Sequence, residues 1–519
     1  MKKPQIAVML VLVCCVIATA QPKLSKKSRS SSAKSVAGKP GAAKQDAAKP
    51  GATEKSTAKI KHALLISIDG LHALDLATYI ANRPDSTLAQ LSKRGIIYSN
   101  ASTPIADSTP GLLALVTGGT PNSTGVYYSD GYDRTLSPPR SGCATRGAVI
   151  TFDETADKDP DAEDAGGGMD PEKMALDPQR NCSPVFPHNF LRVNTIFEVV
   201  KKSGGKTAWS DQHPTFGDFL LGPSGTGVDD LYTPEAHAPG VKKGIAGAEK
   251  HDALKVQAVL NQIKGLDHTG ARQIGVPKLF GMTFITVSVV QKLAGNGYLD
   301  GSGTPSPGLQ GAMDWTDNAI GQMVKELKDR DLFDSTLIVI SAKHGQSPID
   351  QTKRKLMDEG TVPDIVEGVQ KGLLAHSTVD TVAFLWLKDQ SKTAEVVKAI
   401  EAKQVEAGIQ EIYSGESLKL KFPDPQQDPR APDIIVQPIL GVMYSEPSTK
   451  LAEHGGFLDQ DTNVSLLVSI PGAQGQTVKT PVATTQVAPT ILKALGLDPN
   501  SLQSVQIEHT EVLPWLPLQ

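Results

Sequence analysis

Short apolar runs alternate with amphipathic stretches along most of the chain from His62 onward. The clearest runs are six or seven residues long and are bounded by polar residues, glycine or proline, which is typical of strands buried on both faces. They cover residues 63–68, 336–341, 382–387 and 464–470. Such runs, alternating with helical patterns, predict an α/β fold with a mostly parallel central sheet and helices on both faces.

Helical periodicity is clearest just before the run at 336–341. Ile320, Met323, Val324 and Leu327 fall at positions i, i+3, i+4 and i+7. This spacing predicts an amphipathic helix whose apolar face packs on the sheet. A further short strand is predicted at 206–210, just before a polar segment that contains Asp211 and His213.

The first twenty residues have the pattern of a secretory signal peptide. Lys2 and Lys3 precede an apolar run at 6–17, and the small residues 18–20 follow it. A membrane span needs about 20 apolar residues, so a transmembrane anchor is the weaker alternative. We expect residues 1–20 to be removed, the protein to be secreted or periplasmic, and the mature chain to have no membrane span.

Residues 21–60 lack any apolar periodicity and consist almost entirely of Lys, Ala, Ser, Gly and Pro, with ten basic and two acidic residues. Such a segment cannot pack a core, so we predict a disordered basic tether. A solubilising spacer is the favoured interpretation, with contact to anionic lipid, cell wall or nucleic acid left open. Residues 61–519 show no internal repeat and no linker, and we interpret them as one domain with an insertion at about 125–310.

The cysteines predict one disulfide. Cys14 and Cys15 lie in the predicted signal peptide, which leaves Cys143 and Cys182. Two cysteines in an exported chain most often pair, with two free thiols as the alternative. The bond would staple an acidic, glycine-rich segment.

Two of the predicted strands end on residues that can do chemistry. The run at 63–68 leads into Asp69, and the run at 336–341 leads into Lys343 and His344. Ligands of open α/β sheets bind at the carboxyl ends of the strands. A strand-end aspartate can also be a turn former, and a lone histidine is more often structural, so neither motif is decisive alone.

Ser108 begins a predicted helix that ends at Thr117 and Gly118. A hydroxyl at a helix N-terminus lies where backbone N–H groups and the helix dipole favour an anion. The alternative is that Ser108 or Thr109 is a plain N-cap. His454 lies in a further His-Gly segment, just before the apolar run at 464–470.

Taken in order, these segments resemble the motifs of the alkaline phosphatase superfamily, and in particular of the type I phosphodiesterase/nucleotide pyrophosphatase family. Ser108 takes the nucleophile position, Lys343-His344-Gly345 resembles the Asp-His-Gly ligand motif, and His454-Gly455 resembles the later His-Gly ligand motif. Residues 484–496 look like the terminal helix of these enzymes. The sulfatases of the superfamily carry an activating arginine where this chain has Leu112, which disfavours sulfatase activity.

The resemblance implies two metal ions, usually zinc, that activate the nucleophile and neutralise the phosphoryl oxygens. Asp69, Ser108 and His344 match ligands of one ion, and His454 matches a ligand of the other. Lys343 replaces an expected aspartate, and residues 284–295 lack the family's Asp-x-x-Gly-His motif. The matched positions alone cannot complete a two-zinc site, so we expect one divalent ion, zinc, rather than two.

Three interpretations of this altered site remain open. Lys343 can supply positive charge in place of a metal ion, because an ammonium group holds a phosphate oxygen as a point charge. Alternatively, other residues complete a different site, with Asp211 and His213 as the best candidates. In the third interpretation the site is inactive and the fold binds a ligand without turnover.

We expect an exported hydrolase of phosphate esters in which Ser108 forms a covalent phosphoseryl intermediate. Asp69 and His344 would hold the ion with support from His454, and Lys343 would stabilise the equatorial oxygens. The expected partner is a small-molecule phosphate ester, and no nucleic acid is specifically implied. Catalysis requires these side chains to lie within a few ångströms of one another at an open cleft, whereas Lys343 paired to a carboxylate in a filled cleft would oppose it.

Overall fold

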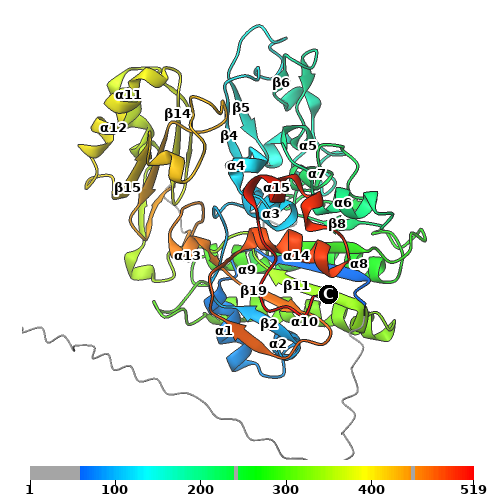
Figure 1. The fold of residues 1–519 in the computed structure, drawn as a ribbon. Coiled ribbons are helices and arrows are strands. Elements are labelled where there is room, and N and C mark those ends of the chain that lie inside the picture. Colours follow the sequence, from blue (N-terminus) through cyan, green and yellow to red (C-terminus); the bar gives the residue numbers. More distant parts are fainter. Residues whose placement is uncertain (1–58, 239–243, 446–449, 519) are drawn as a thin grey trace, which may run out of the picture. The chain divides into compact units, whose positions relative to one another are not determined.

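An eight-stranded sheet lies at the centre of the computed structural model, which describes residues 59–238, 244–445 and 450–518 (Figure 1). The strand order is β20-β2-β19-β11-β1-β10-β8-β9. The bounds are β1 His62–Ile68, β2 Gly95–Tyr98, β8 Ala208–Ser210, β9 Asp230–Tyr232, β10 Leu279–Phe284, β11 Thr336–Ser341, β19 Leu466–Ser469 and β20 Gln476–Val478. Only β19 runs antiparallel to its neighbours, which confirms the predicted α/β fold with a mostly parallel sheet.

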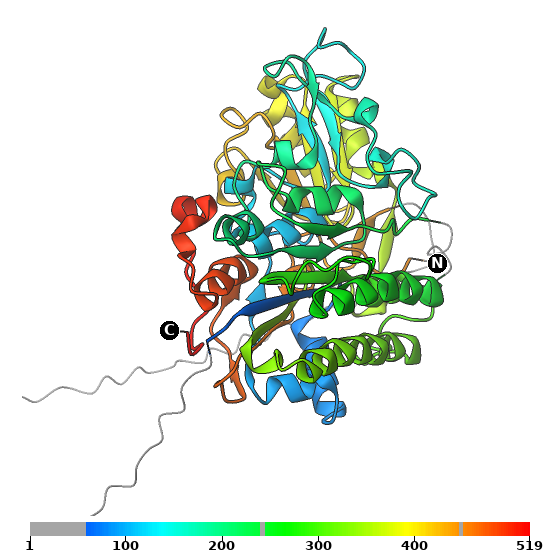
Figure 2. The same cartoon turned by 90° about the vertical axis from the view of Figure 1, so that its right-hand side faces the viewer.

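Both faces of the central sheet are buried, because alternate residues of each strand enter different cores. In β1, Ala63 and Leu65 belong to one core and Leu64 and Ile66 to the other. The first core contains α3 (Ser108–Thr117), α6 (Ile196–Lys202), α7 (Pro214–Leu220) and α14 (Val487–Ala494). The second contains α1 (Ala73–Asn82), α2 (Thr87–Ser92), α8 (Gly244–Ile263), α9 (Thr286–Lys292) and α10 (Pro307–Asp329) (Figure 2).

The helix predicted before the run at 336–341 is α10. Its four periodic residues, Ile320, Met323, Val324 and Leu327, are all buried in the second core, so the predicted packing on the sheet is confirmed. The runs at 63–68 and 336–341 form β1 and β11 in the middle of the sheet.

The run at 382–387 forms β14 (Ala383–Leu387), which lies outside the central sheet. It belongs to a four-stranded antiparallel sheet with β13 (Leu374–Val379), β15 (Ile409–Ser414) and β16 (Ile434–Pro438). Leu385 faces a core formed with α11 (Pro363–Val369) and α12 (Thr393–Glu401), whereas Phe384 and Trp386 face another. Burial on both faces gave this antiparallel strand the continuous apolar pattern of a parallel one.

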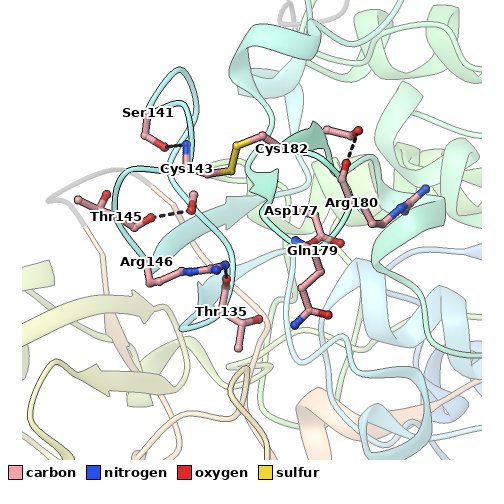
Figure 3. Close-up of a disulfide and its surroundings, with 11 residues drawn as sticks. Thr135, Ser141, Cys143, Thr145, Arg146, Asp177, Gln179, Arg180 and Cys182 are labelled. Atoms are coloured by element: carbon pink, nitrogen blue, oxygen red, sulfur yellow. Dashed lines mark hydrogen bonds between the residues drawn. A yellow bond between two sulfur atoms is a disulfide. The ribbon is translucent and has the colours of Figure 1, made fainter.

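The predicted disulfide between Cys143 and Cys182 is confirmed. It joins the long connection of one hairpin, β4 (Asp130–Asp133) and β5 (Ala148–Thr151), to a second hairpin, β6 (Leu176–Asp177) and β7 (Ser183–Pro184) (Figure 3). Closing a loop of this length restricts the unfolded chain and stabilises the fold by about 4 kcal/mol in the chain-entropy account.

The described residues belong to one compact unit, Ser56–Gln519. Within it, residues 125–310 supply the two disulfide-linked hairpins and also three strands of the central sheet, β8, β9 and β10. The predicted signal peptide and all but the last two residues of the predicted tether lie outside the described residues. In the part of the chain that is described, no helix combines the length and apolar character that crossing a membrane requires.

The remaining elements are short. The strands are β3 Ala101–Ser102, β12 Lys355–Met357, β17 Val442–Tyr444, β18 Asn463–Val464 and β21 Val482–Ala483, and the helices are α4 Pro121–Thr124, α5 Pro187–Phe190, α13 Asp459–Thr462 and α15 Gln503–Glu508.

Candidate active site

The predicted site residues follow three of four adjacent parallel strands at their carboxyl ends. Asp69 follows β1, Lys343 and His344 follow β11, and Asp211 follows β8, while β10 lies between β1 and β8. The backbone N–H of Asp69 donates to Phe284 O at 2.9 Å, so the ends of β1 and β10 stay in register beyond the strands. The sheet therefore gathers these residues at its ligand-binding edge, as predicted.

Ser108 lies in the first turn of α3 with its hydroxyl directed at His344. The N-cap is Asp107, whose carboxylate accepts the backbone N–H of Thr109 at 3.2 Å, so neither Ser108 nor Thr109 is the N-cap. Ser108 Oγ lies 3.2 Å from His344 Nε2, and Ser108 is 8% exposed. Close packing holds α3 there, because a Cβ atom at Gly111 would lie 2.2 Å from Lys343 O.

His344 and His454 stack with their ring centroids 3.7 Å apart. His344 Nδ1 lies 2.9 Å from Gly345 O, and His454 Nδ1 lies 2.9 Å from Ala106 O. A carbonyl only accepts, so each Nδ1 carries the proton and each Nε2 has a lone pair in the neutral ring. Burial and the neighbouring Lys292 lower the pKa of His454 to about 3, and burial and His454 hold the pKa of His344 well below its usual range. At neutral pH His344 Nε2 can therefore accept the Ser108 proton.

Lys343 is completely buried, and its ammonium group lies beside Asp69. Lys343 Nζ is 3.0 Å from Asp69 Oδ2 and 4.0 Å from Asp211 Oδ1. Nζ also lies 4.8 Å from the ring centroid of Phe216. Burial raises the pKa of the Asp69 carboxyl, and the Lys343 ammonium opposes that rise. The lysine is thus the counter-ion of a strand-end carboxylate.

Lys292 is a site residue that the sequence analysis missed. It lies on α9, after the end of β10, and its Nζ is 2.5 Å from Glu453 Oε1. Burial alone raises the pKa of Glu453, but Lys292 and further positive neighbours hold it well below its usual range. Ser288, Gln291 and Lys292 have the spacing of the family's Asp-x-x-Gly-His motif, and this spacing was the signal that could have revealed them.

A cavity of about 320 Å³ opens over these side chains. Its wall includes Asp69, Ser108, His213, Lys292, His344 and His454. Lys343 and Asp211 are fully buried and are not part of this wall. The structure thus brings most of the predicted residues to one cavity, places Lys343 and Asp211 behind Asp69, and leaves the cavity open.

Members of this family typically use metal ions, but these side chains do not fit the family's two-metal arrangement. The ammonium group of Lys343 lies against Asp69, and Ser288 and Lys292 stand at the spacing of the missing ligands. Among the described residues, the group whose ligand atoms lie within 4.8 Å of one another is Glu154, His213 and His237, and not the set of Asp69, His344 and His454.

The fold and this sheet-edge site define an alkaline phosphatase-like protein. Alkaline phosphatase PafA is 14% identical over 85% of this chain and 96% of its own, with a TM-score of 0.56. Murine ectonucleotide pyrophosphatase/phosphodiesterase 5 is 14% identical over 84% and 96%, with a TM-score of 0.55, and its human counterpart is 15% identical over 84% and 95%, with a TM-score of 0.54. At such identities the likeness establishes the fold.

The chain belongs to the type I phosphodiesterase/nucleotide pyrophosphatase family, whose sequence profile matches residues 63–457. This is a family of phosphoric ester hydrolases, and the family predicted from the motifs is confirmed. No curated protein sequence matches the chain.

Proposed function

We propose that this protein is an exported phosphate-ester hydrolase in which Ser108 is the nucleophile. The hydrogen bond of 3.2 Å between Ser108 Oγ and His344 Nε2 is the observation that carries the proposal. A serine whose hydroxyl faces the lone pair of a neutral histidine is the arrangement of an activated nucleophile. The signal-like residues 1–20 support export to the periplasm or the medium.

The reaction proceeds in two displacements on phosphorus. Ser108 Oγ attacks the phosphorus atom as its proton passes to His344 Nε2, and the bond to the leaving oxygen breaks. The attacking and leaving oxygens lie roughly in line on opposite sides of phosphorus, so the leaving oxygen takes its proton from water and His344 passes its own proton to solvent. A second water then hydrolyses the phosphoserine and releases phosphate and free Ser108. The low pKa of His344 in the free protein arises from burial and positive neighbours, so an anionic phosphate in the cavity raises it towards the useful range.

Positive charge for the phosphoryl oxygens comes from Lys292 and from the N-terminus of α3. Lys292 lines the cavity, and the first turn of a helix presents unpaired N–H groups to an anion. Lys343 keeps Asp69 paired from behind the cavity, in place of the direct contact with substrate that the sequence indicated. No step is assigned to a metal ion on Asp69.

A non-catalytic binding protein is the second candidate, and the pairing of Lys343 with Asp69 favours it. The same cavity would then hold a phosphate ester without turnover. A nucleoside monophosphate is a suitable probe for both candidates, because an inactive variant of the murine relative was solved in complex with AMP.

The test is hydrolysis of a nitrophenyl phosphate monoester and diester by the mature protein, with Ser108→Ala, Lys292→Met and the control Ser92→Ala on α2. We expect Ser108→Ala to lose at least about 100-fold in rate and Lys292→Met to raise KM for the anionic substrate. Wild-type protein that is quenched with acid during turnover should carry phosphate on Ser108, as detected by peptide mass spectrometry.

Unchanged activity in Ser108→Ala would refute the assigned nucleophile. No turnover by the wild type, together with AMP binding that weakens in Lys292→Met, would establish the binding protein instead.

A further inference from the structure

A cluster of two histidines and a glutamate lies at the wall of the same cavity, away from the family's metal positions. His213 is the residue just before α7, Glu154 begins a short 3₁₀ helix at Glu154–Ala156, and His237 follows β9. One ligand atom from each lies within 4.8 Å of the others. His213 and His237 both line the cavity that contains Ser108.

A buried carboxylate holds the ring of His213 and lies beside the ring of His237. Glu235 is fully buried, and its Oε1 lies 2.8 Å from His213 Nδ1 and 3.4 Å from His237 Nδ1. Glu235 also accepts the backbone N–H of His237 at 2.7 Å. Because a carboxylate accepts, it favours the proton on His213 Nδ1 and leaves His213 Nε2 as a lone-pair donor. His237 lies between two carboxylates, and its Nε2 becomes a ligand when a metal ion replaces the proton that faces Glu154. A carboxylate behind a ligating histidine is the usual support of metal sites.

The separation of two of the ligand atoms fits a tetrahedral ion, and the third lies within 4.8 Å of both. His237 Nε2 lies 3.2 Å from Glu154 Oε1. Zinc bonds of about 2.0–2.1 Å in a tetrahedron place neighbouring ligand atoms about 3.4 Å apart. The rings of His213 and His237 lie close together, with centroids 5.2 Å apart and an interplanar angle of 19°, so a modest rotation of the partly exposed His237 ring would direct both histidines at one ion.

The cluster is open on one side. The side chain of His213 is 6% exposed, whereas those of Glu154 and His237 are 27% and 42% exposed. Two histidines and one glutamate, with a fourth position left for water or substrate, form the ligand set of many catalytic zinc sites.

We propose that Glu154, His213 and His237 bind one divalent transition-metal ion, with zinc the best match, at the wall of the cavity that holds Ser108. The open coordination position then faces the cavity and takes an anionic oxygen of a ligand there. This site supplies a doubly positive charge beside an arrangement in which part of the family's own ligand set is replaced. The proposal concerns metal binding and does not depend on hydrolysis at Ser108.

The test uses the full mature chain, freed of metal by chelation and titrated with Zn²⁺ in a calorimeter and with Co²⁺ by visible absorption. We expect one ion per chain and the absorption bands of tetrahedral Co²⁺. His237→Ala and Glu154→Gln change partly exposed side chains, so they test the site without removing a core residue, and each should weaken binding at least about tenfold. Glu235→Gln should cost about 10–100-fold by releasing the rings.

Two further variants act as controls for location. His376→Ala removes a histidine on β13 that pairs with Asp130 at 2.8 Å, and it should leave zinc binding unchanged. His454→Gln tests the family's own position and should also leave it unchanged. Three results would each overturn the proposal. They are zinc binding that is undiminished in His237→Ala, zinc binding that is lost in His454→Gln, and no ion bound to the wild type at micromolar zinc. If the protein hydrolyses phosphate esters through Ser108 but binds no zinc, only this inference is refuted. If it binds zinc at these residues but shows no turnover, only the proposed function is refuted.

Discussion

Removing the ammonium group of Lys343 tests whether it is the counter-ion of Asp69. The two side chains are 0% and 3% exposed, and Nζ lies 3.0 Å from Oδ2. At an effective dielectric constant of 20, unit charges at this separation attract by about 5.5 kcal/mol, and the desolvation of both groups offsets part of this. Lys343→Met leaves Asp69 buried without its partner, so we expect the free energy of unfolding to fall by about 3–5 kcal/mol.

Urea unfolding followed by tryptophan fluorescence measures this loss for Lys343→Met, Asp69→Asn and the double variant. The double variant removes both charges of the pair, so it should recover part of the stability that either single change removes, although Asp211 still loses a positive neighbour at 4.0 Å. If the two single losses simply add, the side chains are not coupled and the ion-pair assignment is wrong. A Lys343→Met protein as stable as the wild type would refute it more directly.

Two other changes probe the surroundings of the site. Gly111→Ala places a Cβ atom 2.2 Å from Lys343 O, so we expect an unfolding free energy lower by about 1–3 kcal/mol and a weaker reaction at Ser108, checked by urea unfolding and nitrophenyl phosphate hydrolysis. Normal stability and rate would show that α3 can shift without consequence. Asp461 is buried, and burial raises its pKa to about 7, so between about pH 4 and pH 7 the folded protein keeps a proton that the unfolded chain has lost. Its contribution to stability therefore falls as pH rises, and Asp461→Asn should gain on the wild type by about 1 kcal/mol per pH unit in urea unfolding from pH 5 to 7, whereas a constant difference would contradict the raised pKa.

The central fold was predictable because its strands and helices report their burial locally. The apolar runs of β1 and β11 indicate burial through six or seven adjacent residues. The apolar face of α10 is indicated by four residues at helical spacing. The sheet to which a run belongs is not a local property. The residues of β14 look like those of a central strand because both of its faces are buried, although it pairs in a separate antiparallel sheet.

The candidate site was predictable where a residue follows a strand or begins a helix, as Asp69, His344 and Ser108 do. Pairings between distant segments were not, because they depend on side-chain geometry that no local pattern encodes. Lys292 meets a glutamate 161 positions away, and Glu154 and His237 lie in polar segments without periodicity. His213 was predicted as a possible ligand together with Asp211. In the structure Asp211 instead accepts a hydrogen bond from Trp209 Nε1 at 2.7 Å.

The lysine beside Asp69 changes how the positive charge at this end of the sheet is supplied. A metal ion has to be captured after synthesis, and its supply depends on the surroundings, whereas a lysine is present in every copy as soon as the chain is made. Chelation or metal starvation cannot remove it, so this part of the site matures with the fold itself, even where metal is scarce. In return, the position cannot be retuned by exchanging one ion for another.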